Sequence, residues 1–211
     1  MIDHDADELA QHALALQAKL ARLCDDLDPV RAALPGSRWA LPGQAHEPLA
    51  RAGMVARVFA DELSPWPDLI RLRERAPRVA LLDRHGMVRS LALLALAGRP
   101  GALRCCIDRA ARDGLRELLG TAFEPLSMRL ERGRAAPAGV AAWTPLHWAC
   151  LGYIDWTSLM LPGDRPLQRL VQLSLPQGLL GMRAKHAAFA AEMPAPRALA
   201  LIDELGLEWP C

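Results

Sequence analysis

The chain has 211 residues, of which 52% are hydrophobic and 23% charged, and its formal net charge is +1. This composition supports a substantial core and argues against wholesale disorder, and the near-neutral balance gives no global attraction to nucleic acid or to an anionic membrane. Ala, Leu and Arg are abundant, whereas β-branched and aromatic residues are scarce, which favours helix over strand. We therefore expect an all-α fold, a single globular multi-helix domain without a significant sheet.

Cysteine usage and the N-terminus favour a cytoplasmic location. The number of cysteines is odd and no Cys-x-x-Cys pair occurs, which argues against a disulfide framework and for a reducing compartment; they are Cys24, Cys105, Cys106, Cys150 and Cys211. The first residues, "MIDHDADELAQH", are acidic where a secretory signal is basic and then apolar. The longest apolar run, Leu91 to Ala97, is far shorter than the roughly 20 residues that span a bilayer.

An amphipathic helix is predicted at the N-terminus, before Pro29. Its apolar residues recur at alternating spacings of four and three, which places them on one stripe; they are Leu9, Ala13, Leu16, Leu20, Leu23 and Leu27. We expect the stripe to pack on the protein's own core, since three heptads at most are short for a coiled coil with a partner. His4 and His12 lie among carboxylates and are expected to be polar surface residues. A further helix is expected from Pro48.

The middle of the chain reads as short helices separated by turns. The segment "DLIRLRERA" is predicted to be a solvated helix that ends before Pro77. Two helices joined at His85-Gly86 are expected from Arg78 to Ala97, the second of them buried. After the turn at residues 98–101, Asp113 is a candidate N-cap and Gly120 a helix stop.

The C-terminal third begins after a linker. Residues 132–139, "RGRAAPAG", lack apolar periodicity, so a division into two sub-lobes, 1–131 and 140–211, is the alternative to a single domain. "TPLHWACLGY" (144–153) matches the start of an ankyrin signature, but nothing similar occurs 33 residues away on either side, so no repeat array is expected. Thr144-Pro145 instead predicts a helix start, and Gly152 is expected to help end this helix. Helices are expected over 165–175, 177–193 and 196–205, the last ending at Gly206.

Few residues suggest chemistry. His147 and Cys150 have metal-ligand spacing but no second pair, and Cys105 and Cys106 lie inside an amphipathic pattern where Cys acts as a small hydrophobe. Signatures of serine hydrolases, P-loops and dinucleotide-binding folds are missing from the sequence. We therefore expect no catalytic residue, cofactor or metal. The alternative is a small α-helical enzyme that uses a Cys or His site.

Arg and Trp residues are the candidates for binding. Arg104, Arg112 and Arg116 are helically spaced and could face phosphates or a protein partner, but interleaved acids indicate local ion pairs, so nucleic-acid binding stays an alternative. Trp143, Trp148 and Trp156 fall in one short window. They supply either a core or a binding hot spot, and the core is favoured.

Two segments resemble a known family. Leu91 to Phe123, "LALLALAGRPGALRCCIDRAARDGLRELLGTAF", resembles a segment of the SctK-type (YscK-like) proteins of bacterial type III secretion systems. In these proteins a Leu-rich helix precedes an Arg-containing helix and a Leu-rich turn that ends in Gly. "HWACLGY" and "RPLQRLVQLSLP" (Arg165 to Pro176) look similar to later stretches of the same family. The resemblance covers roughly residues 78 to 200 and includes no catalytic motif.

The resemblance implies a function without catalysis. Members of this family are cytoplasmic accessory proteins of the sorting platform, which connect the cytoplasmic domain of an inner-membrane ring protein to the pods below the injectisome. It implies protein partners, no nucleic acid, and a position at the inner membrane that depends on protein contacts alone. Residues that would contact these partners are, from the sequence, Trp143, Trp148, Trp156, Arg104, Arg112 and Arg116.

Overall fold

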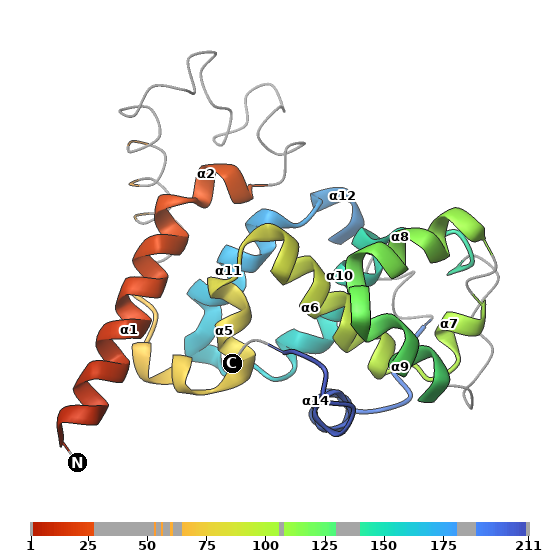
Figure 1. Ribbon diagram of the computed structural model, residues 1–211. Helices are drawn as coiled ribbons and strands as arrows, with labels where there is room; N and C mark the ends of the chain where they lie inside the picture. The colour runs from red at the N-terminus through yellow and green to blue at the C-terminus, as the bar shows by residue number, and fades with distance from the viewer. Residues whose placement is uncertain are drawn as a thin grey trace. The chain divides into compact units, whose positions relative to one another are not determined.

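The computed structural model (Figure 1) describes a helical protein over residues 2–27, 53, 56, 60, 65–105, 108–129, 140–180 and 189–209. Within these residues every regular element is an α- or 3-10 helix and no strand occurs, which confirms the all-α prediction. The helix expected from Pro48 and the linker at 132–139 lie outside the described residues.

The chain folds into two compact units. Unit 1 comprises Met1–Arg84 and Met160–Gln177, and unit 2 comprises His85–Leu159 and Gly178–Cys211. Each unit is therefore built from separate pieces of sequence, and neither coincides with the sub-lobes 1–131 and 140–211 that the composition suggested.

Unit 1 is organised around the N-terminal helix. Its elements are α1 (Ile2–Ala21), α2 (Leu23–Asp26), the 3-10 helix η1 (Leu69–Arg73), α5 (Arg75–Arg78), η2 (Val79–Leu81), η5 (Pro162–Asp164) and α11 (Arg165–Ser174). The predicted stripe faces the core at its C-terminal half, where Leu16, Leu20, Leu23 and Leu27 are buried. Towards the N-terminus Leu9 is half-buried and Ala13 is exposed.

Two predicted boundaries in this region are wrong. The segment "DLIRLRERA" is not one helix that ends before Pro77: η1 stops at Arg73, and α5 then runs through Pro77. Proline is tolerated there because the backbone N–H groups of a first helical turn have no partner within the helix. There is also no break at His85-Gly86, since α6 (Arg84–Ala97) passes through both residues. Gly86 lies in its first turn, where a glycine interrupts no established helix interior.

Unit 2 is built on α6. Its other elements are α7 (Ala102–Cys105), α8 (Arg109–Leu119), η3 (Gly120–Ala122), α9 (Phe123–Arg129), α10 (Pro145–Thr157), α12 (Gln177–Leu180) and α14 (Ala195–Glu204). Every residue of α6 from Leu91 to Ala97 is fully buried, which confirms the prediction for its second half. A helix with apolar residues on all sides is suited to such a central position.

Helices α6 and α10 approach each other at Gly152. A Cβ atom added at Gly152 would lie 1.8 Å from the backbone oxygen of Leu91, closer than atoms can pack. The prediction that Gly152 ends the helix is therefore wrong, because α10 continues to Thr157. The glycine instead allows the two backbones to touch.

Helix ends agree with the sequence at several points. Thr144 precedes α10 with Pro145 in its first turn, Gly120 ends α8 at φ +56°, and Gly206 follows α14 at φ +63°. The cap of α8, however, is Asp108 rather than Asp113, since a carboxylate oxygen of Asp108 accepts from the Ala111 N–H at 3.0 Å. The expected helix over 177–193 does not reach its predicted end, as residues 189–194 are not helical.

Candidate partner-binding surface

The three tryptophans of the predicted binding window lie in different environments. Trp148 and Trp156 are both fully buried, so they belong to the core of unit 2, as favoured from the sequence. Trp143 is half-buried and packs edge-on against Trp148, with ring centroids 5.2 Å apart. Only Trp143 therefore presents side-chain surface that a partner could reach.

His147 lies at the start of α10, where its side chain contacts the residue that precedes the helix. Its Nδ1 accepts a hydrogen bond from the Thr144 backbone N–H at 3.2 Å and lies 2.8 Å from the Thr144 hydroxyl. The imidazole also stacks on Trp143. Burial lowers the pKa of His147, which favours the neutral ring that these contacts require. His147 thus caps a helix, while Cys150, one turn further on, lies fully buried in the core.

Unit 2 also contains a buried cation that the sequence analysis missed. The Arg99 side chain is 2% exposed, and its guanidinium bonds both carboxylate oxygens of Asp155, at 2.5 and 3.0 Å. It also donates to the backbone oxygens of Ala95 at 3.0 Å and Phe189 at 2.9 Å. The planar fork of arginine suits this arrangement. No local pattern marks Arg99, because Asp155 and Phe189 lie 56 and 90 positions away along the chain.

Exposed charged side chains cluster on one surface of unit 2, which we call the α8 surface. We define it as Arg112, Asp113, Arg116 and Glu124, on α8 and at the start of α9. The guanidinium carbons of Arg112 and Arg116 lie 5.9 and 4.8 Å from the ring centroid of Phe123, within the range of a cation–π contact. Arg116 also pairs with Asp113 at 3.3 Å and with Glu124 at 3.4 Å.

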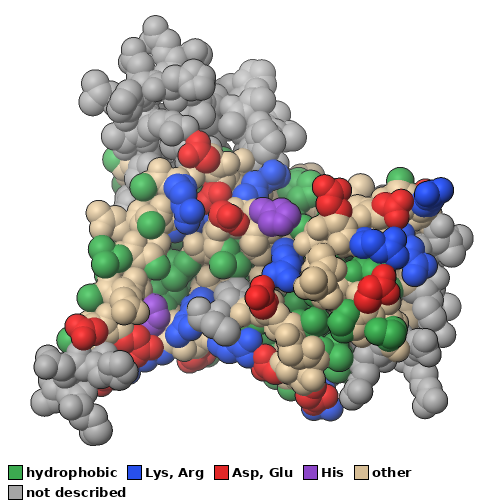
Figure 2. Space-filling model, in the orientation of Figure 1, with side chains coloured by type: hydrophobic (Ala, Val, Ile, Leu, Met, Phe, Trp, Pro, Cys, Tyr) green, Lys and Arg blue, Asp and Glu red, His purple; other side chains and the backbone are tan. Residues whose placement is uncertain are grey.

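These contacts position the two arginines without burying them. Phe123 is 1% exposed and belongs to the core, whereas Arg112 and Arg116 remain exposed above it. Figure 2 shows side chains of both charge signs over the region of α8. The third predicted arginine, Arg104, has a side chain outside the described part of the structure. The α8 surface therefore offers two oriented guanidinium groups, each with hydrogen-bond donors still available to a partner.

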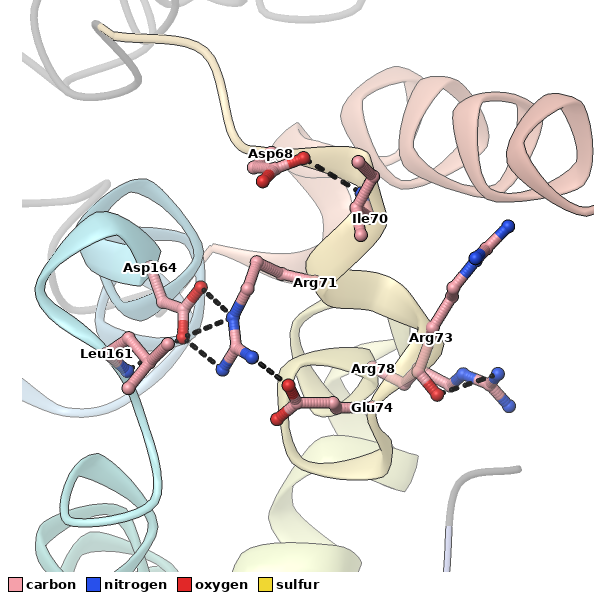
Figure 3. A network of polar contacts seen from close by, with 8 residues as sticks. All are labelled: Asp68, Ile70, Arg71, Arg73, Glu74, Arg78, Leu161 and Asp164. Atoms are coloured by element: carbon pink, nitrogen blue, oxygen red, sulfur yellow. Dashed lines mark hydrogen bonds and ion pairs between the residues drawn. The ribbon is translucent and has the colours of Figure 1, made fainter. Parts of the chain in front are cut away.

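Unit 1 contains a polar network that joins η1 to η5 (Figure 3). The Asp164 side chain is 1% exposed and accepts from Arg71 Nε at 3.0 Å and Arg71 Nη2 at 2.9 Å. Asp164 also accepts from the Leu161 backbone N–H at 2.8 Å, and Arg71 contacts Glu74. The hydrogen bond to Asp164 raises the pKa of Arg71. The prediction that this segment is solvated is therefore wrong for Arg71. Its side chain links two segments that are distant in sequence.

The inner face of α1 carries two further buried polar groups. Lys19 is fully buried; its ammonium group donates to Asp26 and to the Leu82 backbone oxygen, each at 2.6 Å. His12 is 9% exposed and its Nδ1 has no hydrogen-bond partner among the described residues, so the predicted surface position is wrong. Burial first, and then the nearby charge of Arg78, lower the pKa of His12.

The described residues show no grouping of three or more His, Cys, Asp or Glu placed to hold a metal ion. No helix in the described part of the chain combines the length and apolar character needed to cross a membrane. No protein-family model, curated protein or solved structure matches the chain.

Proposed function

We propose that this protein is a non-enzymatic adaptor of a type III secretion sorting platform, which links the inner-membrane ring protein to the cytoplasmic pods. The proposal rests on the resemblance of Leu91 to Phe123 and of the later segments to SctK-type proteins. The observation that carries it is the α8 surface, where arginines from the resembling segment stand exposed and oriented above Phe123.

Oriented arginines suit a protein partner. Arg is enriched among the residues that dominate binding energy at protein interfaces, and its planar guanidinium can donate two hydrogen bonds to one carboxylate. Because Phe123 and the neighbouring acids already restrict the two side chains, less conformational entropy is lost when a partner binds. The carboxylates of Asp113 and Glu124 within 3.4 Å of Arg116 favour a mixed-charge protein surface over a nucleic-acid backbone, since they would face its phosphates.

The enzyme alternative has less support in the described residues. His147 is engaged in capping α10, and Cys150 is fully buried, so neither of these two groups is presented to a substrate. Cys105 and Cys106 have side chains outside the described part of the structure, and their role stays a prediction.

A binding experiment tests the proposal directly. The purified chain is expected to retain the cytoplasmic domain of the ring protein and the pod protein in pull-down assays. The double variant Arg112→Glu, Arg116→Glu is expected to lose at least one of these partners while keeping its helical circular dichroism. Deletion of the gene is expected to stop secretion.

The matched control is Arg197→Glu. Arg197 is an exposed arginine on another helix of unit 2, where it pairs with Glu204 at 3.0 Å, so it controls for a simple change of surface charge. This variant is expected to bind as the wild type does. Absence of both interactions from the folded wild-type chain, with secretion intact after deletion, would overturn the adaptor function.

A further inference from the structure

Helix α1 has a second face that does not contact the core. On its inner face lie the buried residues His12, Leu16, Lys19 and Leu20. On its outer face the exposed residues between Ala10 and Ala21 are all uncharged; they are Ala10, Gln11, Ala13, Leu14, Gln17, Ala18 and Ala21. We call these seven residues the outer face of α1. A long uncharged face is unusual for a helix side in contact with water, where charged residues normally lie opposite the core stripe.

Leu14 lies at the centre of this face. It is 64% exposed, although leucine is among the residues most often buried in proteins. Residues 10, 14, 17 and 21 follow the alternating spacing of four and three that forms the contact line between two packed helices. Alanines along this line leave room for another helix to approach closely, so that backbone and Leu14 make dispersion contacts.

Charges at the two ends of this face indicate what could cover it. Asp7 and Arg22 are both exposed and lie seven and eight residues from Leu14, which is about 10–12 Å along a helix. A parallel pairing of two copies would place like charges together at both ends. An antiparallel pairing would place Asp7 of each copy near Arg22 of the other, so each copy of α1 provides the charge pattern that complements the other.

We propose that the outer face of α1 is a self-association surface, on which two copies of this chain pair their α1 helices antiparallel about a two-fold axis at Leu14. The contact is isologous and closes, so it gives a dimer and not a filament. One helix face on each side places it at the small end of specific interfaces, and the dimer is accordingly weak and reversible. This inference does not depend on the adaptor function.

Analytical ultracentrifugation of the full chain tests the contact. The wild type is expected to shift from monomer to dimer as its concentration rises, and Leu14→Asp is expected to keep it monomeric. The matched control is Leu161→Asp, at another exposed leucine of unit 1, with 52% exposure, that lies outside α1; it should leave the dimer unchanged. Circular dichroism and denaturation check that both variants are folded.

Charge exchange tests the antiparallel orientation. Asp7→Arg and Arg22→Asp are each expected to weaken the dimer, because each places like charges together twice, and the double variant is expected to restore it. A monomer at every concentration, or a dimer insensitive to Leu14→Asp, would overturn the proposal. A dimer that needs Leu14 but is not restored in the double variant would overturn the antiparallel arrangement.

Discussion

In unit 1, charged side chains join segments far apart in sequence, whereas in unit 2 the central helices touch backbone to backbone at Gly152. Arg71 pairs with Asp164 across 93 positions, and Lys19, which pairs with the nearby Asp26, also donates to the Leu82 backbone oxygen across 63 positions. Unit 2 depends on an apolar helix, α6, and on aromatic rings around Trp148, with Arg99 as its buried charged centre. We therefore expect unit 1 to respond to the loss of a charge and to pH, and unit 2 to respond both to a change of volume at Gly152 and to the loss of its buried Arg99.

The largest effect is expected from Gly152→Ala. The new Cβ would lie 1.8 Å from the Leu91 oxygen, and neither backbone can move without displacing its whole helix. We expect a loss of more than about 3 kcal/mol in the free energy of unfolding of unit 2. Urea denaturation followed by tryptophan fluorescence, to which the buried Trp148 and Trp156 contribute, measures it.

Gly114→Ala is the control, a glycine in the interior of α8 in the same unit. Its added Cβ would make only ordinary contacts, at 3.5 Å to the Pro145 ring. Since alanine is about 1 kcal/mol better than glycine in a helix interior, this variant should be as stable as the wild type or more so. Equal effects of the two substitutions would contradict the backbone contact at Gly152.

Next in size is Arg99→Met. It removes the buried partner of Asp155 and leaves the Phe189 oxygen without its donor, so we expect a loss of about 3–5 kcal/mol. Arg99→Lys should recover only part of this, because an ammonium group cannot reproduce the fork geometry. Arg197→Met, which breaks the exposed pair with Glu204, should change stability by less than about 1 kcal/mol. A comparably small effect at Arg99 would mean that the buried pair does not hold unit 2 together.

In unit 1, Asp164→Asn removes the charge of the side chain and keeps its size and shape. The amide keeps an oxygen for the Leu161 N–H but loses the charge that binds Arg71, and we expect a cost of about 1–3 kcal/mol. Glu74→Gln changes the exposed carboxylate that contacts the same Arg71, and should cost less than about 1 kcal/mol. Thermal unfolding monitored by circular dichroism compares them. Equal costs would show that burial of Asp164 adds nothing.

The smallest effect concerns pH. Because the pKa of His12 is lowered in the folded chain, the unfolded chain binds more protons below the ordinary value of 6.5. The contribution of neutral His12 to the free energy of unfolding is therefore fully present above about pH 6.5. It is lost as the pH drops towards the folded pKa. Protonation would add a positive charge near Arg73 and Arg78, which already share the carboxylate of Glu8.

Replacing this histidine tests the assignment. His12→Leu should reduce the loss of stability between neutral and mildly acidic pH, measured by denaturation at a series of pH values. The pKa of His147 is also lowered by burial, so part of the slope is expected to remain. His85→Leu, at an exposed position, serves as the control. An unchanged slope in the His12 variant would exclude His12 as the group that titrates.

Predictions of helix ends are confirmed where the end depends only on neighbouring residues. Thr144-Pro145 starts α10 and Gly206 follows the end of α14, since capping and left-handed backbone depend only on the nearest residues. Asp113 shows the limit of this reasoning, because a carboxylate five residues earlier, on Asp108, takes the capping position. The same limit applies to the candidate binding residues. Their spacing predicted that Arg112 and Arg116 share one helix, but it could not predict that Phe123 lies beneath both side chains.

By itself the sequence determined that the chain is helical, that α1 turns its C-terminal leucines inward, and that the second half of α6 is buried, because propensity and periodicity act over a few turns. Only the tertiary structure decided which polar side chains are buried. Arg71 meets Asp164 across 93 positions and Arg99 meets Asp155 across 56, and no periodicity reports such pairs. Gly152 likewise has a role only because Leu91, on another helix, lies against it.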